Sequence, residues 1–202
     1  MTATLAVPGG LRGVRANAAS IGLWVFMGVV TVLFSLFATA YVMRMNSSDA
    51  VAIALPWQLW LSSSLLVAGS ATLQRASAAA RRMDVGRAGG LLTAGGLCAL
   101  AFLGAQLWAW AALWSAQVMP ASHPAGSFFY LLTAMHGLHV AGGLIAWGWV
   151  ARGFRRDPAG GGWRIALCAR YWHFMLAVWL ALFAMLAWVT PEVARFICGG
   201  SP

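Results

Sequence analysis

The spacing of charged residues is the feature that most constrains this chain of 202 residues. No Asp, Glu, Lys or Arg occurs between Arg87 and Arg152, an uncharged interval of 64 positions, 88 to 151. A helix that crosses a membrane needs about 20 mostly apolar residues and tolerates few charges. The interval is therefore long enough for two such helices joined by a turn.

The composition points to the same class of protein. Apolar residues make up 61% of the chain, charged residues only 8%, and there are 12 tryptophans. These proportions lie outside the range of soluble domains and are typical of polytopic membrane proteins. The net charge of +9 comes entirely from arginines that lie between apolar runs, where basic residues orient a chain in the membrane. We therefore expect no nucleic-acid binding.

The charge-free intervals predict an all-α bundle of five transmembrane helices. The predicted spans are residues 20–43, 57–74, 88–116, 127–151 and 169–189. Two prolines and a glycine within residues 119–126 predict the turn before the fourth span, and a glycine-rich loop at 157–162 precedes the fifth. Residues 1–19 are expected to form an N-terminal cytoplasmic tail, and residues 20–202 a single membrane domain.

The arginines predict how this bundle is oriented, because basic residues gather on the cytoplasmic side of membrane proteins. The N-terminal tail and the second and fourth connections hold 11 arginines, whereas the other connections and the C-terminal tail hold two. This predicts an inside N-terminus, an outside C-terminus and an odd number of spans. Arg81, Arg82, Arg155 and Arg156 lie at the inner surface and are candidates for contacts with lipid headgroups, although topology alone also explains them.

Two histidines lie in the middle of the fourth predicted span. His136 and His139 are three residues apart, so on a helix they project from one face. Polar side chains at that depth are costly and are expected to face other protein rather than lipid. We predict that both pack against neighbouring helices, and that Gly137, Gly142 and Gly143 allow another helix to approach closely.

Other polar and aromatic residues are expected to hold helices together. Gln106 in the third span and the run Ser62 to Ser64 in the second can bond across helices. Trp172 and His173 are expected to anchor the last helix. An aromatic quinone pocket lined by Phe128, Phe129 and Tyr130 is an alternative role for the outer start of the fourth helix, and it stays open at this point.

The histidines do not favour a redox site in this chain. It has four histidines, whereas a coupled haem and copper centre needs about six. His123 falls in the outer turn and His173 near the inner end of the fifth helix, so neither reaches the midplane pair. The three cysteines are far apart and form no C-x-x-C pair. We predict no catalytic, cofactor-binding or metal-ligating residue.

A proton relay through the membrane needs titratable groups inside the spans. No carboxylate falls within any predicted span, so the sequence does not favour such a relay. A weaker role remains open, in which Asp84, Asp157 and His173 collect protons at the inner face. Solvated loop charges are the simpler interpretation of these three groups.

Five motifs, in order along residues 20–189, resemble subunit III of the haem-copper oxidases, the family that includes cytochrome c oxidase. They are LWVFMG followed by FATAYVMR, then PWQLWLSSSLLVAGSATLQRA, FLGAQLWAW, FFYLLTAMHGLHVAGG and YWHFMLAVWL. The chain resembles the five-helix form of this family, without the two-helix arm of seven-helix members. The resemblance therefore implies that the lipid-filled cleft bordered by that arm is reduced or absent.

The chain departs from the family pattern at acidic positions. Val29 and Val30 stand where a serine and a glutamate are usual, Ala109 where a glutamate is usual, and Leu176 where an aspartate is usual. Proton-handling roles that depend on those carboxylates are therefore not carried over to this chain.

The resemblance implies a non-catalytic core subunit of a proton-pumping terminal oxidase in the bacterial inner (cytoplasmic) membrane, within aerobic respiratory electron transport. Its partners would be the catalytic subunit I, which carries haem and copper, together with subunit II and bound phospholipid. It would support assembly, lipid binding and sustained turnover. An accessory subunit of a nitric oxide reductase is one alternative. A free-standing transporter is another, although no span reads as broken in the way that transporter helices often are.

Overall fold

The computed structural model describes residues 10–46, 55–116, 124–158 and 160–197. All regular structure in these ranges is helical, as the sequence predicts. The elements are α1 (Gly10–Met45), α2 (Gln58–Arg81), α3 (Val85–Ser115), α4 (Pro124–Arg156), α5 (Gly162–Trp188) and α6 (Pro191–Ile197). Each of the five long helices overlaps one of the five predicted spans, whereas the short α6 has no counterpart among them.

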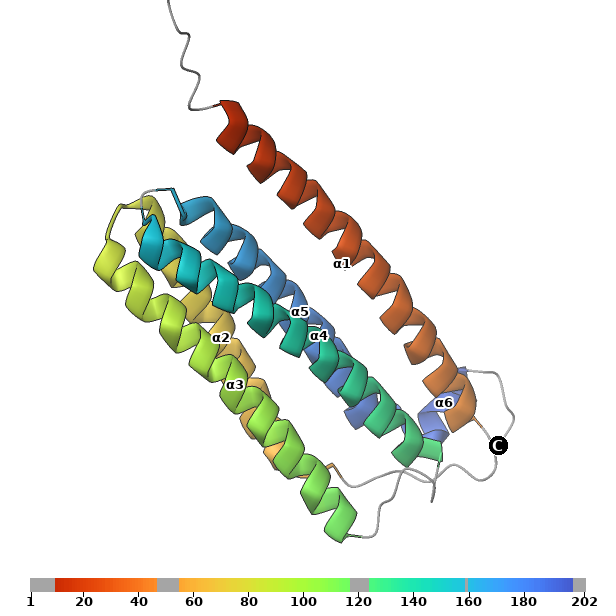
Figure 1. The fold of residues 1–202 in the computed structure, drawn as a ribbon. Coiled ribbons are helices and arrows are strands. Elements are labelled where there is room, and N and C mark those ends of the chain that lie inside the picture. The colour runs from red at the N-terminus through yellow and green to blue at the C-terminus, as the bar shows by residue number, and fades with distance from the viewer. Residues whose placement is uncertain (1–9, 47–54, 117–123, 159, 198–202) are drawn as a thin grey trace, which may run out of the picture.

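The long helices form a bundle in which α1 stands somewhat apart (Figure 1). Helices α2 and α3 make an antiparallel hairpin with the most extensive packing in the molecule, and this hairpin packs against α4 and α5. Helix α1 packs on α5 and α4, and near its C-terminal end it also contacts α6. The turns α2–α3 and α4–α5 lie at the same end of the bundle as the start of α1 (Figure 1).

The tight turn between α2 and α3 is set by local backbone chemistry. Met83 adopts a left-handed conformation with φ of 60°, which ends the α2 helix. Asp84 then caps α3, since its carboxylate accepts a hydrogen bond of 3.1 Å from the backbone N–H of Arg87. A capped first turn satisfies a donor that a helix start otherwise leaves unpaired.

Several helix ends differ from the predicted spans. Helix α1 begins at Gly10, so it includes much of the predicted tail, and α2 continues to Arg81, seven residues beyond position 74. Helix α4 begins at Pro124, inside the predicted turn, because the first turn of a helix accepts proline without losing a hydrogen bond. The rest of that turn, residues 119–123 with His123, lies outside the described residues.

Four helices, α1, α3, α4 and α5, are long and apolar enough to cross a membrane by length and composition. Helix α2 has 24 residues, which is about 36 Å and also long enough, but it is more polar. Its polar residues are mostly buried against other helices: Gln58, Ser62, Ser63, Ser70 and Ser77. A hydropathy criterion therefore supports four of the five predicted spans and does not confirm the second, residues 57–74.

Glycines allow the closest helix contacts in the bundle. A Cβ atom on Gly96 of α3 would collide with the indole ring of Trp147 on α4, and a Cβ on Gly95 would lie 2.6 Å from Cγ of Leu73 on α2. The indole of Trp147 is itself held by a 2.8 Å hydrogen bond from Nε1 to the backbone oxygen of Leu92. The α3–α4 contact therefore depends on the missing side chain at Gly96.

A pair of alanine substitutions on α3 tests this contact. Gly96→Ala should lower the free energy of unfolding by about 1–3 kcal/mol, because the hydrogen-bonded indole cannot move aside without loss. The matched control Gly104→Ala adds the same methyl group where no atom lies within 4 Å. The control should be as stable as the unmodified chain or slightly more stable, since alanine favours helix over glycine. The measurement is thermal unfolding in a mild detergent; equal effects of both substitutions would contradict the packing account.

Candidate functional site

His136 lies in the centre of the bundle and is completely inaccessible to solvent. Its imidazole contacts three aromatic rings, each from a different helix: Phe34 of α1, Phe102 of α3 and Trp179 of α5. The ring centroids lie 6.2, 5.8 and 5.2 Å from that of His136, respectively. These spacings are typical of favourable aromatic pairs. His136 therefore joins α4 to three other helices at one point, which we call the aromatic cage.

Neither ring nitrogen of His136 has a hydrogen-bond partner among the described residues. An unpaired polar group in an apolar interior raises the free energy of the folded state. Contacts with the rings of Phe34, Phe102 and Trp179 offset part of this cost. Within the ranges that the structure describes, no three His, Cys, Asp or Glu side chains come together as a metal-binding group.

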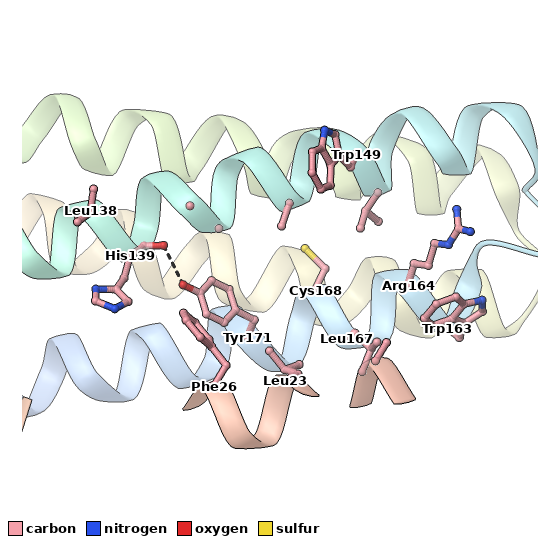
Figure 2. Close-up of a pocket in the computed structure, with 15 residues that line it drawn as sticks. Leu23, Phe26, Leu138, His139, Trp149, Trp163, Arg164, Leu167, Cys168 and Tyr171 are labelled. Carbon is pink, nitrogen blue, oxygen red and sulfur yellow. Dashed lines mark hydrogen bonds between the residues drawn. The ribbon is translucent and has the colours of Figure 1, made fainter. Parts of the chain in front are cut away.

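His139 lies one turn further along α4 and is only half-buried. Its Nδ1 lies 2.7 Å from the backbone oxygen of Met135, and its ring packs against Phe26 and Phe34 of α1. The hydroxyl of Tyr171 on α5 donates a 2.8 Å hydrogen bond to the backbone oxygen of His139 (Figure 2). His139 thus contributes to the contacts of α4 with α1 and α5, whereas His136 also reaches α3.

Polar side chains link α2 to two of its neighbours. Gln106 Nε2 donates to Ser62 Oγ across the α2–α3 contact at 3.4 Å. Trp179 Nε1 donates to Ser63 Oγ at 2.9 Å, which connects α5 to α2. The predicted interhelical role of Gln106 is thus matched by a bond in the structure, while Ser64 bonds only to its own helix, at the backbone oxygen of Trp60.

Trp172 and His173 contact different neighbours of α5. The Trp172 side chain is completely buried and lies near Gly143 of α4, and its Nε1 has no partner among the described residues. His173 is exposed, and its Nδ1 lies 2.7 Å from the backbone oxygen of Ala169 and 3.1 Å from Oγ of Ser70 on α2. Together the two residues connect the last long helix to α4 and α2.

The three glycines predicted to allow close helix approach have different surroundings. A Cβ on Gly143 would lie 2.6 Å from the ring of Tyr171, so α4 and α5 do meet closely there. A Cβ on Gly137 would make only an ordinary contact, 3.9 Å from Leu103. Around Gly142 no atom lies within 4 Å, because this residue lines an open cleft. Gly142 therefore makes no close helix contact within the described residues.

The cleft has a volume of about 710 Å³ and lies between α1, α4 and α5. Its walls are mainly apolar. Leu23 and Phe26 extend from α1 toward α4 and α5, and His139 and Arg164 lie at opposite ends of the cleft (Figure 2). This cleft lies between helices of the bundle and differs from the cleft that the family resemblance places beside a two-helix arm. Neither Arg164 nor Tyr171 was among the predicted site residues. The sequence gives little indication that these two residues line a cleft, since an arginine at a helix start and a tyrosine beside Trp172 are common in membrane helices for other reasons.

The four arginines predicted to contact lipid headgroups are exposed at the ends of α2 and α4. Arg81 lies at the last position of α2, where its Nη1 donates to Ser77 Oγ at 3.1 Å, and Arg82 follows directly. Arg155 and Arg156 end α4 at the same end of the bundle (Figure 1). All four are therefore accessible to a ligand at that end.

The two alternative sites left open by the sequence can be located. The ring of Phe128 packs on Tyr41, Phe129 is buried, and Tyr130 packs on Trp110, so these aromatic residues take part in helix packing. Asp84 caps α3, and Asp157 accepts a 2.9 Å hydrogen bond from the backbone N–H of Gly160. Both aspartates are exposed turn residues with local structural roles.

Alanine substitutions compare the two midplane histidines. His136→Ala should lower the free energy of unfolding by about 2–4 kcal/mol, because it leaves a cavity between four helices. His139→Ala, the matched control, should cost clearly less, since that side chain is half-buried beside the open cleft. Thermal unfolding in mild detergent measures both. A larger loss for His139→Ala would show that the aromatic cage is not the main packing contact.

Comparison with known proteins identifies related membrane subunits. No family model matches the chain. A probable cytochrome c oxidase subunit 3 from Mycobacterium bovis is 34% identical over 127 residues, which is 62% of this chain and 63% of that protein, so the match spans less than two thirds of this relative. Longer matches at 28% identity are cytochrome c oxidase subunit 3 from Bacillus subtilis, over 82% of this chain and 84% of the relative, and cytochrome bo(3) ubiquinol oxidase subunit 3 from Pseudomonas aeruginosa, over 82% of each. Over about four fifths of its length the chain is therefore similar to subunit 3 of two types of oxidase.

Proposed function

We propose that this chain is a non-catalytic subunit III of a proton-pumping terminal oxidase of the cytochrome c oxidase type in the bacterial inner membrane. It binds the catalytic subunit I, which carries the haem and copper, and lies in a complex that also contains subunit II. Its role is to support assembly of the complex, to bind phospholipid and to sustain turnover of the catalytic subunit.

One observation carries this proposal: relatives named as subunit 3 of two oxidase types each match about four fifths of the chain. The two names give different electron donors, cytochrome c and ubiquinol. The similarity therefore supports the subunit type and does not identify the donor. The interior agrees with a supporting role, because its central histidine contacts aromatic rings from three other helices. Such an interior favours a stable scaffold.

We propose that α2 also crosses the membrane, in addition to the four apolar helices α1, α3, α4 and α5. Helix α2 is long enough to cross the hydrocarbon core, and its polar residues are buried against α3 and α5. Polar side chains that bond to neighbouring helices are tolerated within a membrane bundle. The inside N-terminus and outside C-terminus follow from the gathering of 11 of the 13 arginines in or next to the N-terminal segment and the α2–α3 and α4–α5 connections.

Helix α1 offers a surface for the partner subunit or for lipid. Its outward face carries a row of exposed apolar residues at helical spacing: Ile21, Val25, Val29, Val32 and Leu36. Val29 belongs to this row, at a position where the resemblance to the family leads one to expect a serine. An uncharged face of this kind suits close contact with lipid tails or with an apolar helix of subunit I.

We also propose that the cleft between α1, α4 and α5 holds the acyl chains of a phospholipid. The volume of about 710 Å³ and the apolar walls fit hydrocarbon chains. Arg164 lies at the end of the cleft near the start of α5, where its guanidinium can meet a phosphate group. Arg155 and Arg156 end α4 at the same end of the bundle and add positive charge.

Extraction of the tagged chain with a mild detergent tests the function. The expected result is co-purification with a large membrane subunit that shows haem absorption in a reduced-minus-oxidised spectrum and contains copper. The same chain expressed alone should be colourless, because the proposal places all redox groups in the partner. This second preparation is the matched control for adventitious haem.

Two outcomes would contradict the proposal. A partner that carries non-haem iron in place of copper would move the assignment to nitric oxide reduction. A stable chain that is isolated without any partner from its native membrane would remove the main support for a subunit role.

A further inference from the structure

A second cavity, of about 720 Å³, lies at the opposite side of the molecule from α1, where the end of α2 meets the start of α3. We call it the arginine basin. It is lined by Arg75, Ala78, Ala79, Arg82, Asp84, Arg87 and Leu91. None of these residues lines the cleft beside α1. The basin is therefore a separate feature of the bundle.

The geometry of the helical hairpin places the three arginines together. Arg75 lies in the last two turns of α2, and Arg82 is the residue that directly follows the helix. Both line the basin. The left-handed residue Met83 and the cap at Asp84 reverse the chain within three positions. Arg87 is thereby brought from the first turn of α3 to the same cavity.

The positive charge of the basin is not neutralised within the described part of the chain. No ion pair of Arg75, Arg82 or Arg87 occurs among the described residues. Asp84 is the acidic residue of the lining, and one of its carboxylate oxygens is already engaged by the backbone N–H of Arg87. The neighbouring Arg81 bonds instead to Ser77. The basin thus has three guanidinium groups and one carboxylate.

The chemistry of this lining fits a phosphate group attached to an apolar tail. Guanidinium groups bind phosphate oxygens through paired hydrogen bonds. The small side chains of Ala78 and Ala79 leave room between the arginines, and Leu91 adds an apolar wall. Anionic phospholipids are concentrated in the cytoplasmic leaflet, and basic pockets between helices at that surface bind their headgroups.

We propose that the arginine basin binds the phosphate headgroup of an anionic phospholipid. This inference rests on the proposed membrane orientation, which places the α2–α3 turn at the cytoplasmic surface, and it does not require the oxidase assignment. The lipid would hold the free end of the hairpin at the membrane surface, on the side of the bundle remote from α1.

Lipid titration of the purified complex tests the site. The tagged chain, with whatever partner it retains, is stripped of lipid, and phosphatidylglycerol is then added while native mass spectrometry counts bound lipids. Arg82→Gln with Arg87→Gln should weaken binding of one phosphatidylglycerol on the order of tenfold. The matched control is Arg15→Gln with Arg152→Gln, which removes the same charge at exposed residues that line neither the cleft beside α1 nor the basin. The control should leave binding at this site unchanged.

Further measurements distinguish a specific phosphate site from general electrostatic attraction of anionic lipid to the arginines. Phosphatidylcholine should bind more weakly than phosphatidylglycerol, and glycerol 3-phosphate alone should not displace the bound lipid. Equal losses in both double variants, or equal binding of the two lipids, would overturn the proposal. Displacement by glycerol 3-phosphate would overturn it too, because the ligand would then be a soluble phosphate. If thermal unfolding shows that the variant Arg82→Gln with Arg87→Gln is not folded, Arg75→Gln replaces it. This single variant should also bind phosphatidylglycerol more weakly.

Discussion

The contact of His136 with aromatic rings of three other helices is the interaction on which the bundle depends most. Within a bilayer, lipid tails are as apolar as the helices, so association relies on close packing and on interhelical hydrogen bonds rather than on hydrophobic burial. The aromatic cage provides close packing, since His136 of α4 contacts Phe34, Phe102 and Trp179 at one point. It also ties α1, which otherwise packs loosely beside the open cleft, to the rest of the bundle.

Helix α2 completes the scaffold by polar bonds. Its serines bond to Gln106 of α3 and to Trp179 of α5, so the residues that make α2 the least apolar long helix also link it to its neighbours. The exposed row of α1 between Ile21 and Leu36 is instead uncharged. This division, with polar groups inside and apolar rows outside, agrees with a subunit that stabilises a partner in the membrane.

The sequence predicts the all-helical class, the approximate position of each long helix and the location of the two histidines at mid-span. It does this because long uncharged intervals and basic connections have few other interpretations. The start of α1 at Gly10 and the short α6 are missed, since helix ends depend on local capping rather than on hydropathy. The cleft, and the exposure of Gly142 in it, depend on how far α1 stands from α4 and α5. That spacing results from side chains on three helices and has no signature in any one segment.

The central claim is that the midplane histidines hold helices together and bind no redox group. The most direct test is the ratio of haem to catalytic subunit in a complex that carries His136→Leu, measured by absorbance together with protein quantification. The account predicts a lower yield of assembled complex, with the haem ratio and the reduced-minus-oxidised spectrum unchanged. Loss or displacement of a haem band at an unchanged yield would contradict it, because the histidine would then act on the redox centre rather than on packing.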